Sequence, residues 1–193
     1  SMSVERQRIL KAYGAEVVLT PAHMQMNGAI QEAKAIAKRH KKHFIPQQFN
    51  NPANPTKHYN TTAVEIFNAL DGRVDAIVFG VGTGGSIAGC AKFLKEKNPN
   101  IQVVALEPAD SSVLSGQKAG PHMIQGIGAG FIPENYETDV VDEIIGIQND
   151  DAVVMSRRLA KELGVFCGIS AGANVFGASQ LAKRDAFTGK NNV

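Results

Sequence analysis

A glycine-rich stretch near the middle of the chain, Gly80-x-Gly82-x-x-Gly85 followed by Ser86, has residue types and a spacing suited to holding a phosphate. Apolar residues before it predict a short buried strand, and the residues after it begin a predicted helix. Glycine allows backbone conformations that a Cβ atom would forbid and lets the chain approach a ligand closely. The start of the helix adds unpaired N–H groups and a partial positive charge. We therefore predict a phosphate site at this turn.

The same letters also satisfy the dinucleotide-binding fingerprint. Glu107 closes the next predicted strand, 22 residues after Gly85. An acidic side chain at that place can hold a ribose hydroxyl, which would make this region the NAD-binding half of an oxidoreductase. Glycines also occur at such corners for packing reasons alone. From this motif by itself, all three interpretations stay open.

A second strand–turn–helix corner is predicted at Gly168-Ile169-Ser170-Ala171-Gly172. Parallel strands end at one edge of a sheet, so Ser170 could reach the far side of a flat ligand lying across the strand ends. An amide-rich segment at residues 47–55 adds polar groups. Such a pocket suits a small phosphorylated aromatic molecule better than a dinucleotide. Ser170 could instead be a helix N-cap, and spacing alone does not decide between the two.

The elements that would position these corners alternate between helices and strands, which predicts an α/β fold with a parallel sheet. Residues 109–137 are irregular, and so long a loop inside an α/β unit is usually functional. We expect Asn149 or Asp150 to cap the helix that follows. The helices are expected at residues 4–13, 27–40, 57–70, 86–97, 149–163 and 173–183, and the strands at 15–19, 43–45, 75–79, 101–106, 140–147 and 165–167.

The overall composition is that of an ordinary globular protein, with 20 Lys and Arg residues against 18 Asp and Glu residues and a formal net charge of +2. This balance gives no reason to expect a nucleic-acid or membrane partner. No apolar run approaches the roughly 20 residues that span a bilayer. Cys90 and Cys167 are expected to be buried free thiols in a reducing cytoplasm. The five histidines and two cysteines have no metal-ligand spacing, so no metal is expected.

Six stretches carry a more specific signal than any single motif. They are Met2-Ser3-Val4-Glu5-Arg6, Tyr13-Gly14-Ala15-Glu16-Val17, Gln47-Gln48-Phe49-Asn50-Asn51-Pro52-Ala53-Asn54-Pro55, the turn from Gly80 to Ser86, Pro121-His122-Met123-Ile124-Gln125-Gly126-Ile127-Gly128-Ala129-Gly130-Phe131-Ile132-Pro133, and the corner from Gly168 to Gly172. Together they resemble the cysteine synthase, or O-acetylserine sulfhydrylase, family of fold-type II pyridoxal phosphate enzymes. The resemblance is collinear over almost the whole chain.

The resemblance implies a parallel-rich twisted sheet with helices on both faces and a remnant of a second, smaller α/β domain. Residues 1–46 would be that remnant, which is mobile in the family. Residues 47–193 would be most of the larger cofactor-binding domain. The family's reaction joins O-acetylserine and sulfide to give cysteine and acetate, with pyridoxal phosphate as the electron sink. The resemblance also implies that the complete enzyme is a homodimer in the cytoplasm.

The family's site residues map onto this sequence by the same resemblance. Backbone N–H and hydroxyl groups would hold the cofactor phosphate, the hydroxyl of Ser170 would bond the pyridine nitrogen, Gln48 would help to hold the substrate carboxylate, and two glycines would line the mouth of the site. The phosphate residues would be Gly82, Thr83, Gly84, Gly85 and Ser86, and the mouth glycines Gly126 and Gly128.

Two departures limit what this chain could do alone. The family's Schiff-base lysine and a substrate-binding loop lie upstream of the stretch matching Met2 to Arg6, so neither is expected here. Lysine both holds the cofactor and abstracts the α-proton, and we expect the chain by itself not to turn over. The family also continues beyond the position of Val193. The chain is therefore expected to be an internal fragment of the enzyme.

The resemblance also implies a protein partner, the C-terminal tail of serine acetyltransferase, which would dock near Lys118 and His122. Many relatives carry a basic residue at the position of Met123. A non-catalytic module that docks such a tail is a further alternative for the chain as given.

Overall fold

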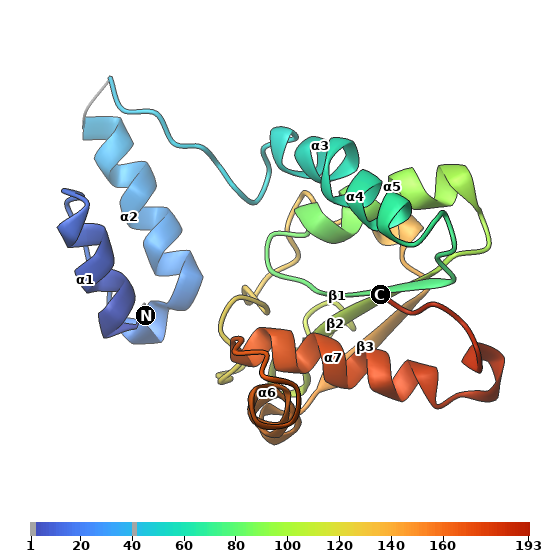
Figure 1. The fold of residues 1–193 in the computed structure, drawn as a ribbon. Coiled ribbons are helices and arrows are strands. Elements are labelled where there is room, and N and C mark those ends of the chain that lie inside the picture. Colours follow the sequence, from blue (N-terminus) through green and yellow to red (C-terminus); the bar gives the residue numbers. More distant parts are fainter. Residues whose placement is uncertain (1–2, 40–41) are drawn as a thin grey trace. The chain divides into compact units, whose positions relative to one another are not determined.

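The computed structural model describes residues 3–39 and 42–193, and the chain divides into two compact units, Ser1–Pro46 and Gln47–Val193. The first unit contains helix α1 (Val4–Ala12), a single 3-10 turn η1 (Ala22–Met24) and helix α2 (Gln25–Arg39) (Figure 1). Both predicted helices are confirmed. Gly14 ends the first with φ +83°, as expected of a residue that follows a helix. His40, the expected end of the second helix, lies outside the described residues.

Both strands predicted in the first unit are wrong. Residues 15–19 and 43–45 lie outside regular secondary structure. A run of β-branched residues favours an extended backbone, but only hydrogen bonding to a neighbouring strand makes a ladder. Among residues 3–39 and 42–46 no such ladder forms. The described part of this unit is therefore helical, and its expected α/β character is not found there.

The second unit is built on a parallel sheet of three strands, β1 (Ala76–Gly80), β2 (Gln102–Pro108) and β3 (Glu143–Ile147), in the order β1-β2-β3. The register pairs Ala76 with Gln102 and Val104 with Glu143. These strands confirm the predicted parallel sheet to within a few residues. The last residues of the chain run beside β1, where the N–H of Val78 donates to the carbonyl of Val193 at 2.7 Å (Figure 1).

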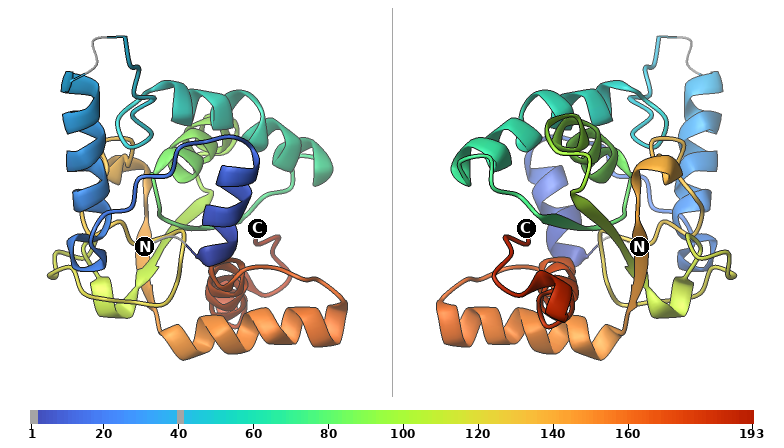
Figure 2. Two further views of the ribbon diagram at one scale, coloured as in Figure 1. Left: turned by 90° about the vertical axis from the view of Figure 1, so that its left-hand side faces the viewer. Right: turned by 90° about the vertical axis from the view of Figure 1, so that its right-hand side faces the viewer.

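Helices cover both faces of this sheet (Figures 1 and 2). On one face lie α3 (Ala53–Asn60), α4 (Thr62–Ala69) and α5 (Gly85–Lys97). On the other lies α7 (Ile169–Ala182), with α6 (Asn149–Leu163) packed against it. Since every described helix is short or polar on one side, none combines the length and apolarity needed to cross a membrane.

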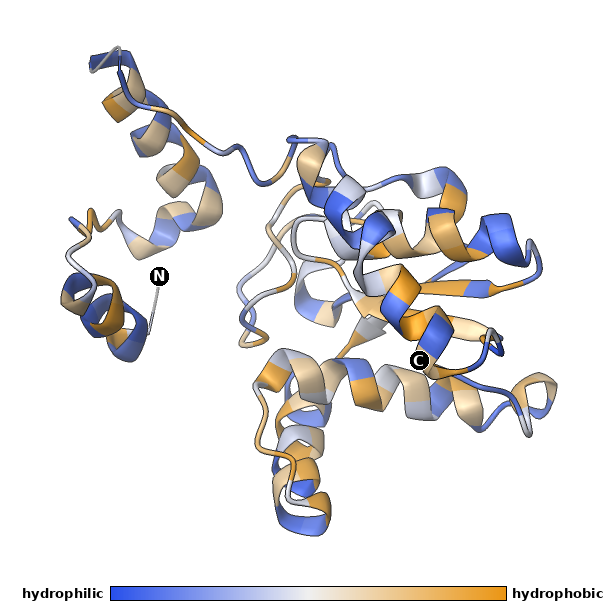
Figure 3. Ribbon diagram, turned by 45° about the horizontal axis from the view of Figure 1, so that its top comes forward, coloured by the Kyte–Doolittle hydropathy of each residue, from blue (hydrophilic) through white to orange (hydrophobic). Residues whose placement is uncertain are grey.

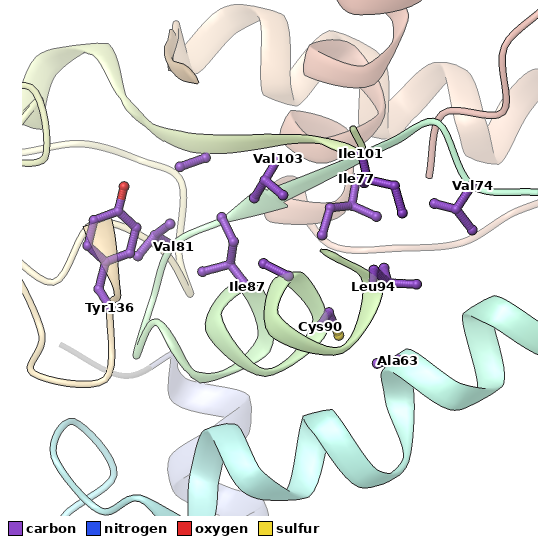
Figure 4. Packing of buried hydrophobic residues seen from close by; sticks show 12 residues of the cluster. Ala63, Val74, Ile77, Val81, Ile87, Cys90, Leu94, Ile101, Val103 and Tyr136 are labelled. Carbon is purple, nitrogen blue, oxygen red and sulfur yellow. The ribbon is translucent and has the colours of Figure 1, made fainter. Parts of the chain in front are cut away.

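Successive side chains of each strand point to opposite faces of the sheet, so core residues lie on both faces. Ile77 and Val103 point toward α5, where Ile87 and Leu94 meet them (Figure 4). Their neighbours along the strands point toward α7 and pack with Leu181. The strands are mainly hydrophobic along their length (Figure 3), because both faces of the sheet are buried. This packing fixes the carboxyl end of β1, where the glycine turn begins, and the position of α7, at whose start the second corner lies.

One predicted helix differs clearly from the structure in its bounds. The helix expected at residues 57–70 begins earlier, at Ala53, and is divided at Thr61, whose φ of −127° and ψ of −75° are not helical. The hydroxyl of Thr61 donates to the carbonyl of Lys57 at 2.8 Å, in competition with the helical bonding of that carbonyl. Pro55 is accommodated because it lies in the first turn of α3, where an N–H is not needed.

The region around α6 corrects two further predictions. Residues 165–167 form no strand, and Phe166 is 97% exposed. The N-cap of α6 is Gln148, not Asn149 or Asp150. The side chain of Asn149 is used elsewhere, since it accepts the N–H of Met123 at 2.8 Å and donates to Asp110 at 2.6 Å. It thereby ties the loop that contains Met123 to the start of the helix.

Candidate functional site

The glycine turn lies where β1 ends and α5 begins. The N–H of Val81 makes the last sheet-like bond, to the carbonyl of Leu106 at 2.9 Å. Gly84 then caps α5 in the left-handed conformation, with φ +80°. A Cβ atom there would also lie 2.8 Å from the backbone nitrogen of Tyr136. Only glycine fits this position, for conformational and steric reasons together.

The turn presents backbone donors that the protein itself does not use. Within the described chain, no backbone acceptor takes the N–H groups of Thr83, Gly84 or Ser86, and no side chain caps α5. The N–H of Gly85 reaches the hydroxyl of Thr83 only at 3.4 Å. Free N–H groups at the positive end of a 13-residue helix form an anion site.

Both hydroxyls of the turn are contacted from α3. Asn54 donates through Nδ2 to Oγ1 of Thr83 at 2.9 Å. Nε2 of His58 lies 3.1 Å from Oγ of Ser86. The two hydroxyls are half-buried, and these contacts hold them beside the free N–H groups.

The loop from Gly126 to Gly130 packs directly on the turn. The N–H of Gly128 donates to the carbonyl of Val81 at 2.9 Å. The carbonyl oxygen of Gly126 occupies the place that a side chain at position 82 would need, so Gly82 must be glycine. Gly126 and Gly128 have φ values of +103° and +66°. The loop therefore depends on glycine at the two positions predicted to line the mouth of the site.

Ser170 lies beside Gly126 of this loop. It is the second residue of α7, whose N-cap is Gly168, so its interpretation as an N-cap is wrong. Its Oγ lies 3.5 Å from the place where a Cβ atom of Gly126 would be. One turn later on α7, Oδ1 of Asn174 accepts the N–H of Gly80 at 2.6 Å. The fold thus brings the two predicted corners together around Gly126.

Gln48 is anchored by its backbone. Its carbonyl accepts Nδ2 of Asn54 and Nδ2 of Asn135, each at 2.9 Å, and Asn135 also donates its N–H to the carbonyl of Phe49. The Gln48 side chain is exposed. Asn54 contacts both Gln48 and Thr83, so the predicted substrate loop is fixed relative to the glycine turn.

Lys118 and His122 occupy different environments. Lys118 is exposed. Nε2 of His122 lies 3.0 Å from the carbonyl oxygen of Gly128, which can only accept, so Nε2 carries the proton. Nδ1 of this ring is buried and has no partner in the described chain. His122 supports the glycine loop, whereas Lys118 is open to a partner.

Glu107 is not placed to hold a ribose hydroxyl, as a dinucleotide site would require. Its side chain is 2% exposed and accepts the N–H groups of Leu114 at 2.7 Å and Ser115 at 3.2 Å, together with the hydroxyl of Ser115. The carboxylate is committed to the loop after β2, so it is not available to a ribose. Burial, and secondarily the charge of Glu107, raises the pKa of the neighbouring Tyr136.

Sequence reasoning missed Asn54, His58 and Asn174. Their signal was helical spacing, because Asn54 and His58 are four residues apart on one helix, as are Ser170 and Asn174 on another. The predicted helices began too late, at residues 57 and 173, to show it. Cys90 is fully buried, as predicted, and burial raises the pKa of its thiol to about 12. Cys167 is only half-buried. Over residues 3–39 and 42–193, no three His, Cys, Asp or Glu side chains cluster as metal ligands would.

An open α/β sheet with a phosphate turn at one strand end, and a serine at the start of a helix packed on the sheet, defines a protein that binds a small phosphorylated molecule. Residues 1–193 match the pyridoxal-phosphate dependent enzyme family, and the chain belongs to that family. This assignment excludes the NAD-binding half of an oxidoreductase and confirms the fold class that the sequence predicted.

Comparison with individual proteins shows which members of the family the chain is similar to. A cysteine synthase of Staphylococcus aureus (strain Mu50 / ATCC 700699) is 52% identical over 184 residues, which are 95% of this chain and 59% of the relative. The crystal structure of a cysteine synthase from Entamoeba histolytica superposes with a TM-score of 0.93 at 46% identity, over all of this chain and 57% of the other. A hydrogen sulfide-producing enzyme from Fusobacterium nucleatum gives 0.95 at 43% identity, over all of this chain and 65% of the other. The chain thus spans about three-fifths of its relatives' length.

The residues present fit pyridoxal phosphate, the cofactor of this family. The phosphate would meet the free N–H groups of Thr83, Gly84 and Ser86, in a turn where Cβ atoms at positions 82 and 84 would collide with backbone. A flat ring extending from that phosphate would have the neutral hydroxyl of Ser170, which lies beside Gly126, at the neighbouring corner. No charged side chain of the glycine turn opposes the anion.

Proposed function

We propose that the complete protein containing this chain is a cysteine synthase. In this reaction sulfide replaces the acetate of O-acetylserine at the β-carbon, giving cysteine. The names of the relatives, cysteine synthases of two organisms at 46% to 52% identity, support the reaction class. The observation within this chain that carries the proposal is the convergence of Gly82, Gly126 and Ser170 at the carboxyl edge of the sheet.

Each part of the site has a distinct task in this proposal. Thr83, Gly84 and Ser86 bind the cofactor phosphate through their N–H groups. The hydroxyl of Ser170 bonds the pyridine nitrogen without supplying a full proton. Bound pyridoxal phosphate supplies the electron sink that stabilises negative charge at the substrate Cα as the β-substituent leaves. The side chain of Gln48 holds the substrate carboxylate, and its loop is kept in place by Asn54.

Gly126 and Gly128, at the mouth of the site, leave the approach to Ser170 open. Gly126 and Gly128 have left-handed backbones, and a Cβ atom at position 128 would lie 2.6 Å from Cγ of Pro108. Side chains there would be strained and would narrow the approach to Ser170.

We assign the lysine that binds the cofactor covalently to a part of the complete protein outside this chain. Lys57 and Lys92 are exposed. Lys95 is paired with Asp142 at 2.8 Å, and Lys97 is in the last turn of α5. At 1.5 Å per residue, the last turn of that helix is about 15 Å or more from the glycine turn. The 193-residue chain is therefore expected to bind phosphate without catalysing turnover.

Partners and location are part of the same proposal. The complete protein would be a homodimer in the cytoplasm, where the free thiols of Cys90 and Cys167 would stay reduced. The tail of a serine acetyltransferase would dock at Lys118, which is exposed, more than at His122, whose ring is occupied with Gly128.

The test is a product assay with the full-length protein and pyridoxal phosphate. O-Acetylserine with sulfide should give cysteine and acetate, faster than with thiosulfate or homocysteine as the acceptor. A preference for homocysteine would instead indicate a cystathionine-forming enzyme, like the O-acetylserine dependent cystathionine beta-synthase of Helicobacter pylori, which is 38% identical. Absence of any reaction of O-acetylserine would contradict the proposal.

A further inference from the structure

The two hydroxyls of the glycine turn are both contacted from one face of α3. Asn54 and His58 are four residues apart, which places them one above the other on the same side of the helix. Asn54 contacts Thr83 and His58 contacts Ser86. We infer that Asn54 and His58 are positioning residues that orient these hydroxyls as donors to a bound phosphate. The inference rests on the proposed function, because it assigns the anion at this turn to the cofactor.

Asn54 fixes the direction of the Thr83 hydroxyl. One hydrogen of its amide goes to the carbonyl of Gln48, an obligate acceptor at 2.9 Å, so the contacting atom must be the nitrogen. The second hydrogen then goes to Oγ1 of Thr83 at 2.9 Å. Since Oγ1 accepts from Asn54, and weakly from the N–H of Gly85, the hydrogen of the Thr83 hydroxyl is left to point away from both. It is available to an anion at the turn.

His58 fixes the Ser86 hydroxyl through a chain of three side chains. Nδ1 of His58 lies 3.0 Å from Oγ1 of Thr62, and Nε2 lies 3.1 Å from Oγ of Ser86. Both partners are hydroxyls, so the chain can run in either direction. A phosphate that accepts the Ser86 hydrogen selects one of them, in which Nε2 of His58 carries a proton and donates to Ser86.

The close packing of α3 on α5 makes this support rigid. A Cβ atom at position 85 would collide with the amide of Asn54, and one at position 89 would lie 2.8 Å from the nitrogen of Tyr59. The glycines of α5 therefore lie directly against α3. This close packing leaves the side chains of Asn54 and His58 little room to adopt other rotamers. Charge-assisted bonds to phosphate weaken steeply when their geometry is lost.

The experiment titrates the 193-residue chain with inorganic phosphate and follows the amide 1H–15N signals of Thr83 and Gly84. His58→Phe and Asn54→Leu, which keep the side-chain size, should each weaken phosphate binding about tenfold, the loss expected when a charge-assisted hydrogen bond loses its orientation. His58→Gln, which restores a donor, should bind within about threefold of the unchanged chain. Thr56→Ala, at an exposed position of the same helix, is the matched control and should change nothing.

A double-mutant cycle separates positioning from a merely structural effect. In a Ser86→Ala background, His58→Phe should cause no further loss beyond about twofold, because its effect passes through the missing hydroxyl. The 15N chemical shifts of the His58 ring give a readout on the unchanged chain, and Nε2 should be protonated when phosphate is bound.

Two outcomes overturn the inference in different ways. If phosphate leaves the amide signals of Thr83 and Gly84 unmoved, the phosphate assignment fails and the proposed function fails with it. If phosphate shifts these signals, but His58→Phe and Asn54→Leu bind it normally or Nε2 of His58 is unprotonated in the complex, only the positioning roles fail.

Discussion

Gly126 and Ser170 lie side by side although 44 positions separate them in the sequence, and a Cβ atom on the glycine would be 3.5 Å from the serine hydroxyl. The glycine belongs to the long loop after β2, and the serine to the first turn of α7. This contact joins the glycine turn, through the carbonyl of Gly126 at Gly82, to the corner that would hold the ring of the cofactor.

Gly126→Ala is predicted to weaken binding of pyridoxal phosphate more than it weakens the fold. The left-handed backbone at φ +103° would cost a residue with a side chain about 1–2 kcal/mol. The methyl group would also stand in front of Ser170. Gly116→Ala is the control, because it has φ +82° with no atom within 4 Å of the added Cβ. Urea unfolding should show similar losses for both variants, and cofactor titration of the full-length protein should show a loss for Gly126→Ala alone. Equal cofactor affinities would contradict the role given to this loop.

Asn174→Ala should destabilise the second unit by about 1–3 kcal/mol, because it leaves the half-buried N–H of Gly80 without its acceptor. Asn174→Asp keeps an acceptor oxygen and should recover most of that stability. Urea denaturation followed by circular dichroism compares the two variants. Equal stabilities of Asn174→Ala and the unchanged chain would show that the bond between α7 and the end of β1 contributes little.

The two thiols should react at different rates. Burial raises the pKa of Cys90 to about 12 and leaves its side chain inaccessible, whereas Cys167 is half-buried. At pH 8 only about one Cys90 in ten thousand is a thiolate, even before access is considered. Iodoacetamide followed by peptide mass spectrometry should label Cys167 in the native chain and both cysteines in urea. Rapid native labelling of Cys90 would contradict the packing of α5.

The ion pair between Arg184 and Glu143 should give a pH-dependent contribution to stability. Two hydrogen bonds from the guanidinium, at 2.7 and 2.8 Å, lower the pKa of Glu143 below its ordinary value of 4.5. A lowered pKa in the folded state stabilises the fold above the ordinary value, and that contribution is lost as the pH falls through the folded pKa. Because both side chains are partly exposed, the pair is worth about 0.5–1 kcal/mol.

Glu143→Gln is the variant that measures this contribution. Its melting temperature should be lower than that of the unchanged chain at pH 7, and the two should converge once the pH has fallen below the lowered pKa of Glu143, where the carboxylate is protonated in both states. A difference that persists unchanged at low pH would assign the effect to packing instead of charge.

Much of the second unit was predictable from the sequence because its elements are locally determined. The apolar runs of β1 and β2 are buried on both faces, and the helices have clear apolar spacing and a terminal residue such as Gly164 at the end of α6. The three wrong strands, at residues 15–19, 43–45 and 165–167, failed for one common reason. An apolar run specifies an extended chain, but the partner that would complete a ladder lies elsewhere in the fold.

The site was partly predictable in the same way. The glycine turn follows from a motif, and its strand and helix are confirmed. That Ser170 is not the N-cap depends on the exact start of α7 at Ile169, and the bonds of Glu107 depend on how the irregular loop after β2 folds back; spacing reveals neither. Asn54 and His58 gave only a weak signal, since their common face matters only once α3 is placed against α5.

Electron density of pyridoxal phosphate in a crystal of the full-length protein would test the assigned site most directly. We predict the phosphate within hydrogen-bonding distance of the N–H groups of Thr83 and Gly84, and the pyridine nitrogen within that distance of Oγ of Ser170. Density for the phosphate away from the glycine turn, or a ring nitrogen bonded to another side chain with Ser170 uninvolved, would contradict the assignment of this site.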